Sequence, residues 1–306
     1  MDIAAGAREI DHSTRVFRFA PSPNGELHLG HAYSALLNHR LARENHARFL
    51  LRLEDIDLAR CSHAYEEQIV EDLHFLKVDW DETRRRQSDH FDVYAKGLDV
   101  LRETGLCYRG FMTRGEIRRF AELRVEETGD LWPRDPDGSP LYPGLDRRQP
   151  AEEQDRRARD GESFAWRIDV AAAVERTGPL EWEEWGRGPD GESGRVVAKP
   201  AEWGDFILAR RDVPTSYHLA VVVDDAIQGV TDVVRGRDLF YATSAHRLLQ
   251  DLLGLPAPRY HHHDLILAED GRKLSKSARD TSIRSLREAG LQRADIVRML
   301  GLEGVV

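Results

Sequence analysis

The sequence predicts an α/β fold with a parallel central sheet, and three successive patterns near its N-terminus carry this prediction. An apolar run over 16–19 is typical of a short buried strand. Apolar residues then recur at helical spacing from Ala32 to Leu41, and a second apolar run covers 49–53. A strand, a helix and a strand in this order form a βαβ unit, whose two strands lie parallel.

Capping signals predict the helices that follow. Ser62 is an N-cap residue for a helix that ends at about Leu76, and Ser88 is one for the next helix. Thr113 and Glu116 have the spacing of a capping box at the start of a third helix. In each case a side-chain oxygen can accept a hydrogen bond from an N–H group that the first turn of a helix leaves unpaired.

The middle of the chain changes composition. Prolines and glycines crowd the segment 129–150, which predicts a loop. The highly charged segment 151–161 is expected to be helical. Glycines recur over 178–200, which predicts hairpins or loops in an inserted subdomain.

The remaining segments return to regular structure. Their patterns predict a strand over 205–210, a helix that ends before Gly254, and a strand over 265–267. The apolar segment 217–223 fits a strand or a helix, because periodicity does not decide between them. The tail over 282–300 is expected to form two short helices parted by a glycine.

Length and composition indicate a globular protein of about two domains. The 44 basic and 54 acidic side chains give a net charge of −10, which argues against a general nucleic-acid binder. Any RNA contact therefore needs a local basic face. The two cysteines, Cys61 and Cys107, indicate no disulfide framework and fit a reducing cytoplasm. Residues 1–14 are expected to be a loose tail without a signal peptide, and no apolar run is long enough to span a membrane.

The segment Arg18–His31 holds the residues with the clearest chemical meaning. It reads RFAPSPNGELHLGH, and its prolines and glycines predict a tight loop between the first strand and the first helix. His28, Gly30 and His31 then lie at the helix entrance, where free N–H groups and the positive end of the helix dipole attract phosphate. Taken alone, so short a pattern favours a plain turn with incidental histidines.

A second motif, near the other end of the sequence, changes this interpretation. Residues 273–277 read KLSKS and resemble the KMSKS signature, while residues 28–31 read HLGH and resemble the HIGH signature of class I aminoacyl-tRNA synthetases. With RLEDID over 52–57 and VRG over 234–236, these motifs resemble the glutamyl-tRNA synthetase family over most of residues 15–280. Ordered motifs of this kind rarely agree by chance.

The resemblance implies a Rossmann-type parallel sheet that carries both signatures, an inserted subdomain and a short C-terminal helical segment. Residues 15–105 and 201–253 are expected to form the Rossmann-type catalytic domain, and residues 106–200 the inserted connective or acceptor-type subdomain. Residues 254–306 are expected to hold the signature loop and the helical C-terminal segment, with residues 1–14 as the N-terminal tail.

The resemblance also implies the first reaction, in which a carboxylate of glutamate attacks the α-phosphorus of ATP and gives glutamyl-adenylate and pyrophosphate. This activation is expected to proceed without tRNA, with Mg²⁺ as the counter-ion of ATP. The catalytic residues that the resemblance implies are His28, His31, Lys273 and Lys276. The implied ATP-binding residues are His28, Gly30, His31, Lys273, Ser275 and Lys276.

Glutamate has two carboxylates and one ammonium, so its pocket needs two cationic partners and one anionic partner. Arginine suits a carboxylate because its planar fork binds both oxygens. The glutamate-binding residues that the resemblance implies are Arg18, Ala20, Ser22, Glu54, Tyr217 and Arg235. Which arginine binds which carboxylate stays open.

The sequence departs from the family at a zinc site. Relatives often carry Cys-x-Cys and Tyr-x-x-x-Cys there, but the positions of the three cysteines hold Gly110, Met112 and Asp146. Cys107 alone cannot build a tetrahedral site, so neither a structural zinc nor another metal ligand is expected. Apolar packing is expected in its place, among Leu106, Phe111, Leu141 and Leu145.

Few residues follow Ser277, so a separate anticodon-binding domain is not expected. A catalytic half alone is similar to the glutamyl-queuosine tRNA(Asp) synthetases, a family that attaches glutamate to queuosine in the tRNA(Asp) anticodon. The partners expected are L-glutamate, ATP and the anticodon stem-loop of tRNA(Asp), for a monomeric cytoplasmic protein without membrane contact. The arginines expected to contact RNA phosphates are Arg114, Arg118, Arg119, Arg147, Arg148, Arg156, Arg157 and Arg159.

Three alternatives stay open at this point. The first is a minimal glutamyl-tRNA synthetase that charges a tRNA 3′ end. The second is an inactive RNA-binding paralogue, against which the intact signature residues argue. The third is a small HxGH nucleotidyltransferase, which the motifs around Arg18 and Glu54 disfavour.

Overall fold

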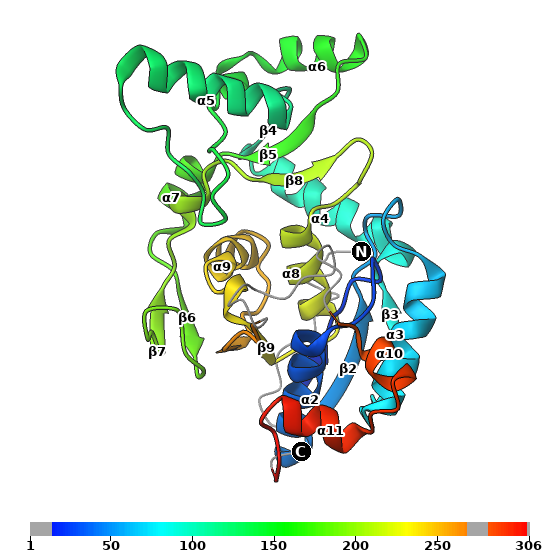
Figure 1. Cartoon of the computed structure of the whole chain (residues 1–306). Helices are drawn as coiled ribbons and strands as arrows, with labels where there is room; N and C mark the ends of the chain where they lie inside the picture. The colour runs from blue at the N-terminus through cyan, green and yellow to red at the C-terminus, as the bar shows by residue number, and fades with distance from the viewer. Residues whose placement is uncertain (1–13, 268–280, 305–306) are drawn as a thin grey trace.

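A seven-stranded sheet forms the centre of the molecule, in the order β3-β2-β1-β9-β10-β6-β7 (Figure 1). The computed structural model describes residues 14–267 and 281–304, so most of the predicted N-terminal tail lies outside the described residues. The strands are β1 (Val16–Phe19), β2 (Arg48–Leu53), β3 (Arg85–Arg86), β6 (Glu181–Glu184), β7 (Gly194–Val197), β9 (Asp232–Gly236) and β10 (Arg259–His263). Within these ranges all neighbours pair in parallel except β6 and β7, which form an antiparallel hairpin. The predicted α/β fold with a parallel sheet is confirmed.

The first elements form the predicted βαβ unit. β1 and β2 pair with Phe17 opposite Phe49, and helix α2 (Leu29–Glu44) connects them. Both phenylalanines are buried and belong to the same apolar cluster as Leu36 of α2. Three further helices complete this apolar cluster, α3 (His63–Phe75), α10 (Ile283–Glu288) and α11 (Arg293–Met299). Ser62 caps α3 as predicted, and the two tail helices are present.

A second apolar cluster is built around four helices, α4 (Phe91–Glu103), α7 (Val170–Thr177), α8 (Tyr217–Ile227) and α9 (Ala242–Leu252). The segment 217–223, which the sequence left open, is therefore helical. Ser216 caps α8 and accepts the N–H of Leu219 at 3.3 Å. Most side chains of α8 are buried, which explains why its sequence lacks an amphipathic period. No helix within the two described ranges is both long and apolar enough to cross a membrane.

A separate three-stranded antiparallel sheet, β4-β5-β8, lies in the upper part of the molecule in Figure 1. Its strands are β4 (Cys107–Gly110), β5 (Ala165–Ile168) and β8 (Ile207–Arg210), with helices α5 (Arg114–Thr128) and α6 (Ala151–Arg159) near them. The predicted capping box of Thr113 and Glu116 begins α5. β6 and β7 come from the range 106–200 but extend the large sheet, so the boundaries of the insertion stay a prediction.

Two local predictions are wrong. Ser88 does not cap a helix, because its N–H and its hydroxyl donate to the carboxylate of Asp55 at 2.8 and 2.6 Å, and α4 begins only at Phe91. The strand predicted over 265–267 lies earlier in the chain, as β10. Periodicity missed β10 because its run of histidines has no apolar pattern, although His262 is buried.

Asp146 organises the region in which apolar packing was predicted instead of zinc. One oxygen of its buried carboxylate accepts the N–H of Phe111 at 2.9 Å and the hydroxyl of Tyr142. The other oxygen accepts from the guanidinium of Arg157 at 2.9 Å. Arg157 also lies over the ring of Phe111, 3.8 Å from its centroid. A partly buried ion pair with a cation–π contact therefore joins the end of β4 to α6.

The predicted packing among four apolar side chains is wrong. Leu145 is 49% exposed, and Leu106 packs into the cluster around α4 and α8 instead. Among the residues that the structure describes, no group of three or more His, Cys, Asp or Glu side chains could hold a metal ion. The expectation of no structural zinc stays a prediction.

Removing the carboxylate of Asp146 should destabilise the protein. In Asp146→Ala the N–H of Phe111 and the hydroxyl of Tyr142 lose their acceptor, and the partly buried Arg157 loses one of its partners. We expect the free energy of unfolding in urea to fall by about 3 kcal/mol. Asp160→Ala is the control, because Asp160 forms a solvent-exposed pair with Arg156 and its loss should matter little. Equal losses in both variants would contradict the anchoring role of Asp146.

Candidate active site

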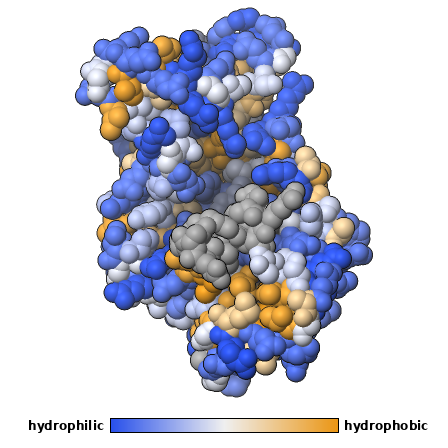
Figure 2. All heavy atoms as spheres, in the orientation of Figure 1, coloured by the Kyte–Doolittle hydropathy of each residue, from blue (hydrophilic) through white to orange (hydrophobic). Residues whose placement is uncertain are grey.

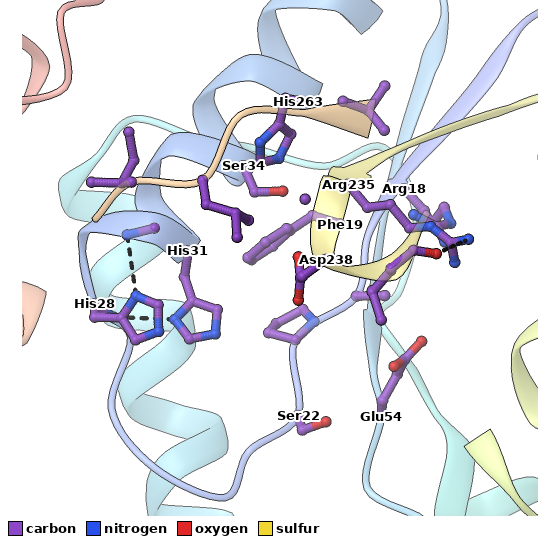
Figure 3. Close-up of a pocket in the computed structure, with 18 of the residues that line it drawn as sticks. Arg18, Phe19, Ser22, His28, His31, Ser34, Glu54, Arg235, Asp238 and His263 are labelled. Carbon is purple, nitrogen blue, oxygen red and sulfur yellow. Dashed lines mark hydrogen bonds between the residues drawn. The ribbon is translucent and has the colours of Figure 1, made fainter. Parts of the chain in front are cut away.

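The carboxyl ends of β1, β2 and β9 open into a cavity of about 480 Å³ (Figure 3). Ligands of parallel sheets bind at this edge. All six predicted glutamate-binding residues and the three residues of the first signature line the cavity: Arg18, Ala20, Ser22, Glu54, Tyr217, Arg235, His28, Gly30 and His31. The structure thus brings together segments that lie far apart in the sequence. Lys273, Ser275 and Lys276 lie outside the described residues.

The two histidines of the signature begin α2 with a reciprocal pair of hydrogen bonds. Nδ1 of His28 accepts the N–H of Gly30 at 3.1 Å, and Nδ1 of His31 accepts the N–H of His28 at 3.2 Å. Because each Nδ1 accepts, each neutral ring carries its proton on Nε2. The rings lie side by side in Figure 3, with centroids 3.8 Å apart. A Cβ at Gly30 would lie 3.1 Å from the His28 ring, so glycine keeps this turn uncrowded.

Asp225 binds two arginines at one side of the cavity. Its Oδ1 accepts from Nε of Arg18 at 3.1 Å and from Nη1 of Arg52 at 2.7 Å. Arg52 is fully buried and also donates to Oε1 of Glu54 at 3.3 Å. Burial alone would raise the pKa of Asp225, but the two arginines outweigh it and hold this pKa below its usual range. Burial raises the pKa of Glu54, although the arginines oppose it.

Sequence reasoning missed Asp225 and its neighbour Asp224, although a signal was present. Both acids follow a run of apolar residues in α8, and a buried acid needs partners. Asp224 accepts hydrogen bonds from Arg85, Gln87 and Tyr94 at 2.8, 2.9 and 2.8 Å. The two acids therefore tie α8 to β1, β2, β3 and α4, which fixes the floor of the cavity.

Arg235, in β9, lies close to Arg18 in Figure 3, while Glu54 lies below both. Its guanidinium donates to neutral acceptors: the hydroxyls of Tyr217 and Thr243, the carbonyl of Leu239, and ring nitrogens of His246 and His262. Arg18 has Asp225 as its ion-pair partner, whereas no carboxylate of the described residues forms an ion pair with Arg235. The cavity wall at Arg235 therefore keeps a positive charge that an anionic ligand can balance.

A second cavity of about 480 Å³ adjoins the first, and Tyr217 lines both. Its walls come from α5, from the proline-rich loop before α6 and from the segment between β8 and α8. Figure 2 shows this face hollowed between the upper part of the molecule and the rest. The arginines that line this second cavity are Arg60, Arg114, Arg118, Arg167 and Arg210.

The arginines predicted to contact RNA differ in their availability. Arg147, Arg156 and Arg157 form ion pairs with neighbouring acidic side chains. Arg114 and Arg118 form no ion pair within the part of the chain that the structure describes, and both line the second cavity. Arg114 and Arg118 are therefore the better placed to bind phosphate.

Known proteins resemble this chain over nearly its whole length. The family described as "tRNA synthetases class I (E and Q), catalytic domain" matches residues 15–306. The chain is 43% identical over 294 residues to the Glutamyl-Q tRNA(Asp) synthetase of Rhodobacter capsulatus, which spans 94% of this chain and 100% of that protein. It is 38% identical over 293 residues to a Glutamyl-Q tRNA(Asp) synthetase of Nitratidesulfovibrio vulgaris, over 93% of this chain and 85% of that protein.

Longer proteins match over about half of their length. The Glutamate–tRNA ligase of Aquifex aeolicus is 37% identical over 288 residues, which span 94% of this chain and 56% of that protein. Among solved structures, a glutamate-tRNA synthetase of Elizabethkingia anophelis superposes with a TM-score of 0.71 at 27% identity, over 91% of this chain and 54% of that one. The fold and the catalytic-domain match agree.

The ion pairs of Asp225 should make the free energy of unfolding depend on pH. Its pKa is lower in the folded than in the unfolded chain, so the stabilisation is present above the unfolded value of about 3.9 and is lost as the pH falls through the folded value. At pH 7, Asp225→Asn removes the carboxylate that pairs with the buried Arg18 and the nearest of the carboxylates that pair with the buried Arg52. The free energy of unfolding should fall by about 3 kcal/mol. Below about pH 4 the difference should shrink.

Urea unfolding of both proteins from pH 3 to pH 7 measures this difference, with Asp92→Asn as the control. Asp92 pairs with Lys96 on the surface, so this variant should follow the wild type at each pH. A loss in Asp225→Asn that stays constant across the range would contradict the electrostatic account.

Proposed function

Because this chain belongs to the class I tRNA synthetases (E and Q), whose catalytic domain it matches, we propose that it activates L-glutamate with ATP and transfers the glutamate to the queuosine base in the anticodon of tRNA(Asp). Enzymes of this family are ligases. The observation that carries the proposal is the convergence of the HxGH signature and all six expected glutamate positions on one cavity. The proposal includes a cytoplasmic location and a monomeric enzyme.

The charges around the cavity fit glutamate. Arg235 meets only neutral acceptors among the described residues and provides a positive charge for one carboxylate. Arg18 is the second cationic partner, and Glu54 is the anionic partner for the ammonium group. Glutamine carries an amide in place of the side-chain carboxylate, so it would leave an arginine uncompensated in a buried site.

Activation follows from the two signatures. A carboxylate oxygen of glutamate attacks the α-phosphorus of ATP, the bond to the β-phosphate oxygen breaks, and pyrophosphate leaves with its negative charge. The protons on Nε2 of His28 and His31 support hydrogen bonds to phosphate oxygens at the N-terminus of α2. Lys273 and Lys276 belong to the same proposal as partners of the departing pyrophosphate. Mg²⁺ would be held by the phosphates and by water.

Transfer needs an acceptor beside the adenylate. The second cavity shares Tyr217 with the first, so a nucleoside there would approach the activated carboxyl group. A hydroxyl of the queuosine cyclopentene ring attacks the carbonyl carbon, an ester forms, and AMP leaves with the bonding electron pair while the hydroxyl proton passes to solvent. Arg114 and Arg118 support phosphate binding at the rim. The 43% identity to a Glutamyl-Q tRNA(Asp) synthetase favours this acceptor over a tRNA 3′ end.

The first test is amino-acid activation without RNA. The protein should exchange labelled pyrophosphate into ATP when given L-glutamate, and kcat/KM with glutamine should be lower by about a hundredfold or more. Lys276→Ala should slow the exchange by about 10²-fold or more without unfolding the protein. Lys199→Ala is the matched control, because the side chain of Lys199 is 68% exposed and forms a surface ion pair with Glu202. Wild-type exchange in Lys276→Ala, or equal use of glutamine, would refute the assignment.

The second test identifies the acceptor nucleotide. Labelled glutamate should appear on tRNA(Asp) that carries queuosine and on its isolated anticodon stem-loop, and should be absent from unmodified tRNA(Asp). Arg118→Glu should weaken RNA binding about tenfold and lower its salt dependence, because a phosphate contact is lost. Arg124→Glu, on the same helix but outside the second cavity, is the control. Label at the 3′ end of tRNA(Glu) would favour the minimal glutamyl-tRNA synthetase instead.

A further inference from the structure

A chain of buried hydrogen bonds leads from Arg235 away from the cavity. Nε of Arg235 donates to Nε2 of His262 at 3.1 Å, and Nδ1 of His262 donates to Oε2 of Glu184 at 2.6 Å. His262 and Glu184 are 2% and 1% exposed. His262 lies in β10, and Glu184 ends β6, the neighbouring strand of the sheet. Neither residue lines the cavity.

The direction of each hydrogen bond is fixed by chemistry. A guanidinium only donates, so Nε2 of His262 must be the acceptor, and the proton of the neutral ring must be on Nδ1. A carboxylate only accepts, so Glu184 selects this tautomer. Burial lowers the pKa of His262 to about 4, which keeps the ring neutral although Glu184 opposes this effect.

The backbone around Glu184 is built for this contact. Its other oxygen, Oε1, accepts the N–H of His262 at 2.9 Å and the N–H of Gly186 at 3.0 Å. A Cβ at Gly186 would lie 2.7 Å from the backbone nitrogen of His262, so only glycine allows this approach. The carboxylate of Glu184 is therefore held in one orientation, with Oε2 facing the ring.

A second histidine supports Arg235 on another side. Nη1 of Arg235 donates to Nδ1 of His246 at 3.4 Å, so His246 carries its proton on Nε2, which faces Nδ1 of His218 at 3.2 Å. Burial holds the pKa of His246 well below its usual value. Arg235 is thus held by two neutral rings, which orient its guanidinium without neutralising its charge.

We propose that Glu184 and His262 are positioning residues that hold Arg235 for the carboxylate of its substrate. Glu184 sets the tautomer of His262, and His262 fixes the plane of the guanidinium while leaving its positive charge for the ligand. This inference rests on the proposed function, because it takes glutamate as the ligand of Arg235. It gives strand β6 an indirect role in amino-acid binding, although Glu184 does not line the cavity.

Glu184→Gln tests the relay with little change in volume. Its carbonyl oxygen keeps the two backbone N–H groups, so its NH₂ group faces Nδ1 of His262 and forces the proton onto Nε2, against the N–H of Arg235. We expect the KM for glutamate in pyrophosphate exchange to rise about tenfold or more. The KM for ATP and the melting temperature should change little.

The matched control is Glu183→Gln. Glu183 precedes Glu184 in β6 and points to the opposite face, where its side chain is 56% exposed. It should keep the wild-type KM for glutamate. A KM in Glu184→Gln equal to that of the wild type would overturn the proposal, as would a fall in melting temperature with no change in KM.

Variants of His262 keep the proposal testable if Glu184→Gln folds poorly. His262→Gln retains an amide oxygen that can accept from Arg235, so its KM should stay within about threefold of the wild type, whereas His262→Leu should raise the KM about tenfold or more. In the His262→Gln background, Glu184→Gln should add less than about twofold, because no ring is left to switch. Equal KM values for His262→Gln and His262→Leu would overturn the relay.

The tautomer itself can be read without activity. In a spectrum of the ¹⁵N-histidine-labelled protein, the resonances that His262→Gln removes should be those of an Nδ1–H ring, and Glu184→Gln should convert them to those of an Nε2–H ring. An Nε2–H ring in the wild type would overturn the proposal. Failure of the wild type to exchange pyrophosphate with glutamate would instead refute the proposed function, so the two failures are distinguishable.

Discussion

The ion pairs between Asp225 and the two arginines Arg18 and Arg52 are the constraint on which the site depends. Arg18 lies in β1 and Arg52 in β2, while Asp225 comes from α8, 207 residues after Arg18. A single unpaired charge at this depth would be costly, so Asp225 needs its two arginines and Arg18 needs Asp225. This requirement fixes α8 against the ends of both strands. Glu54 follows β2 directly, and its carboxylate accepts from Arg52 at 3.3 Å. Asp225 therefore also orients Glu54, because it holds Arg52.

The two arginines of the cavity are stabilised in different ways, and the difference has a chemical consequence. Arg18 has an ionised partner in Asp225, so part of its charge is already balanced before any ligand arrives. The nitrogen atoms and oxygen atoms around Arg235 belong to neutral groups among the described residues, and its charge is left for a ligand. The nearest carboxylate on this path, that of Glu184, reaches Arg235 only through the ring of His262. Separating the acid from the arginine by a neutral ring keeps the arginine oriented and still attractive to an anion.

The sequence predicted the elements that depend on neighbouring residues, but not those that depend on residues far away in the chain. The N-cap of Ser62 and the capping box of Thr113 depend on residues three positions away, and both are present. Ser88 has the same chemistry but is bound to Asp55, which no local pattern reveals. In the site, the candidate ATP- and glutamate-binding residues that the structure describes line one cavity, as the sequence predicted. Asp225 was missed because a pair of acids in an apolar segment indicates that they have partners but does not identify those partners. His262 was missed for a similar reason, because the role of a buried histidine depends on the groups that its two ring nitrogens contact.

The two cavities are connected through one short stretch at the start of α8. Tyr217 lines both of them, and its hydroxyl accepts from Arg235 at 3.4 Å. His218 lines the second cavity and contacts His246, which accepts from Arg235 in the first. Asp225 holds the same helix two turns further on. A displacement of α8 would therefore move Tyr217, which separates the two cavities, together with the groups that orient Arg235. The burial of most α8 side chains and the buried ion pairs of Asp225 hold the helix in place.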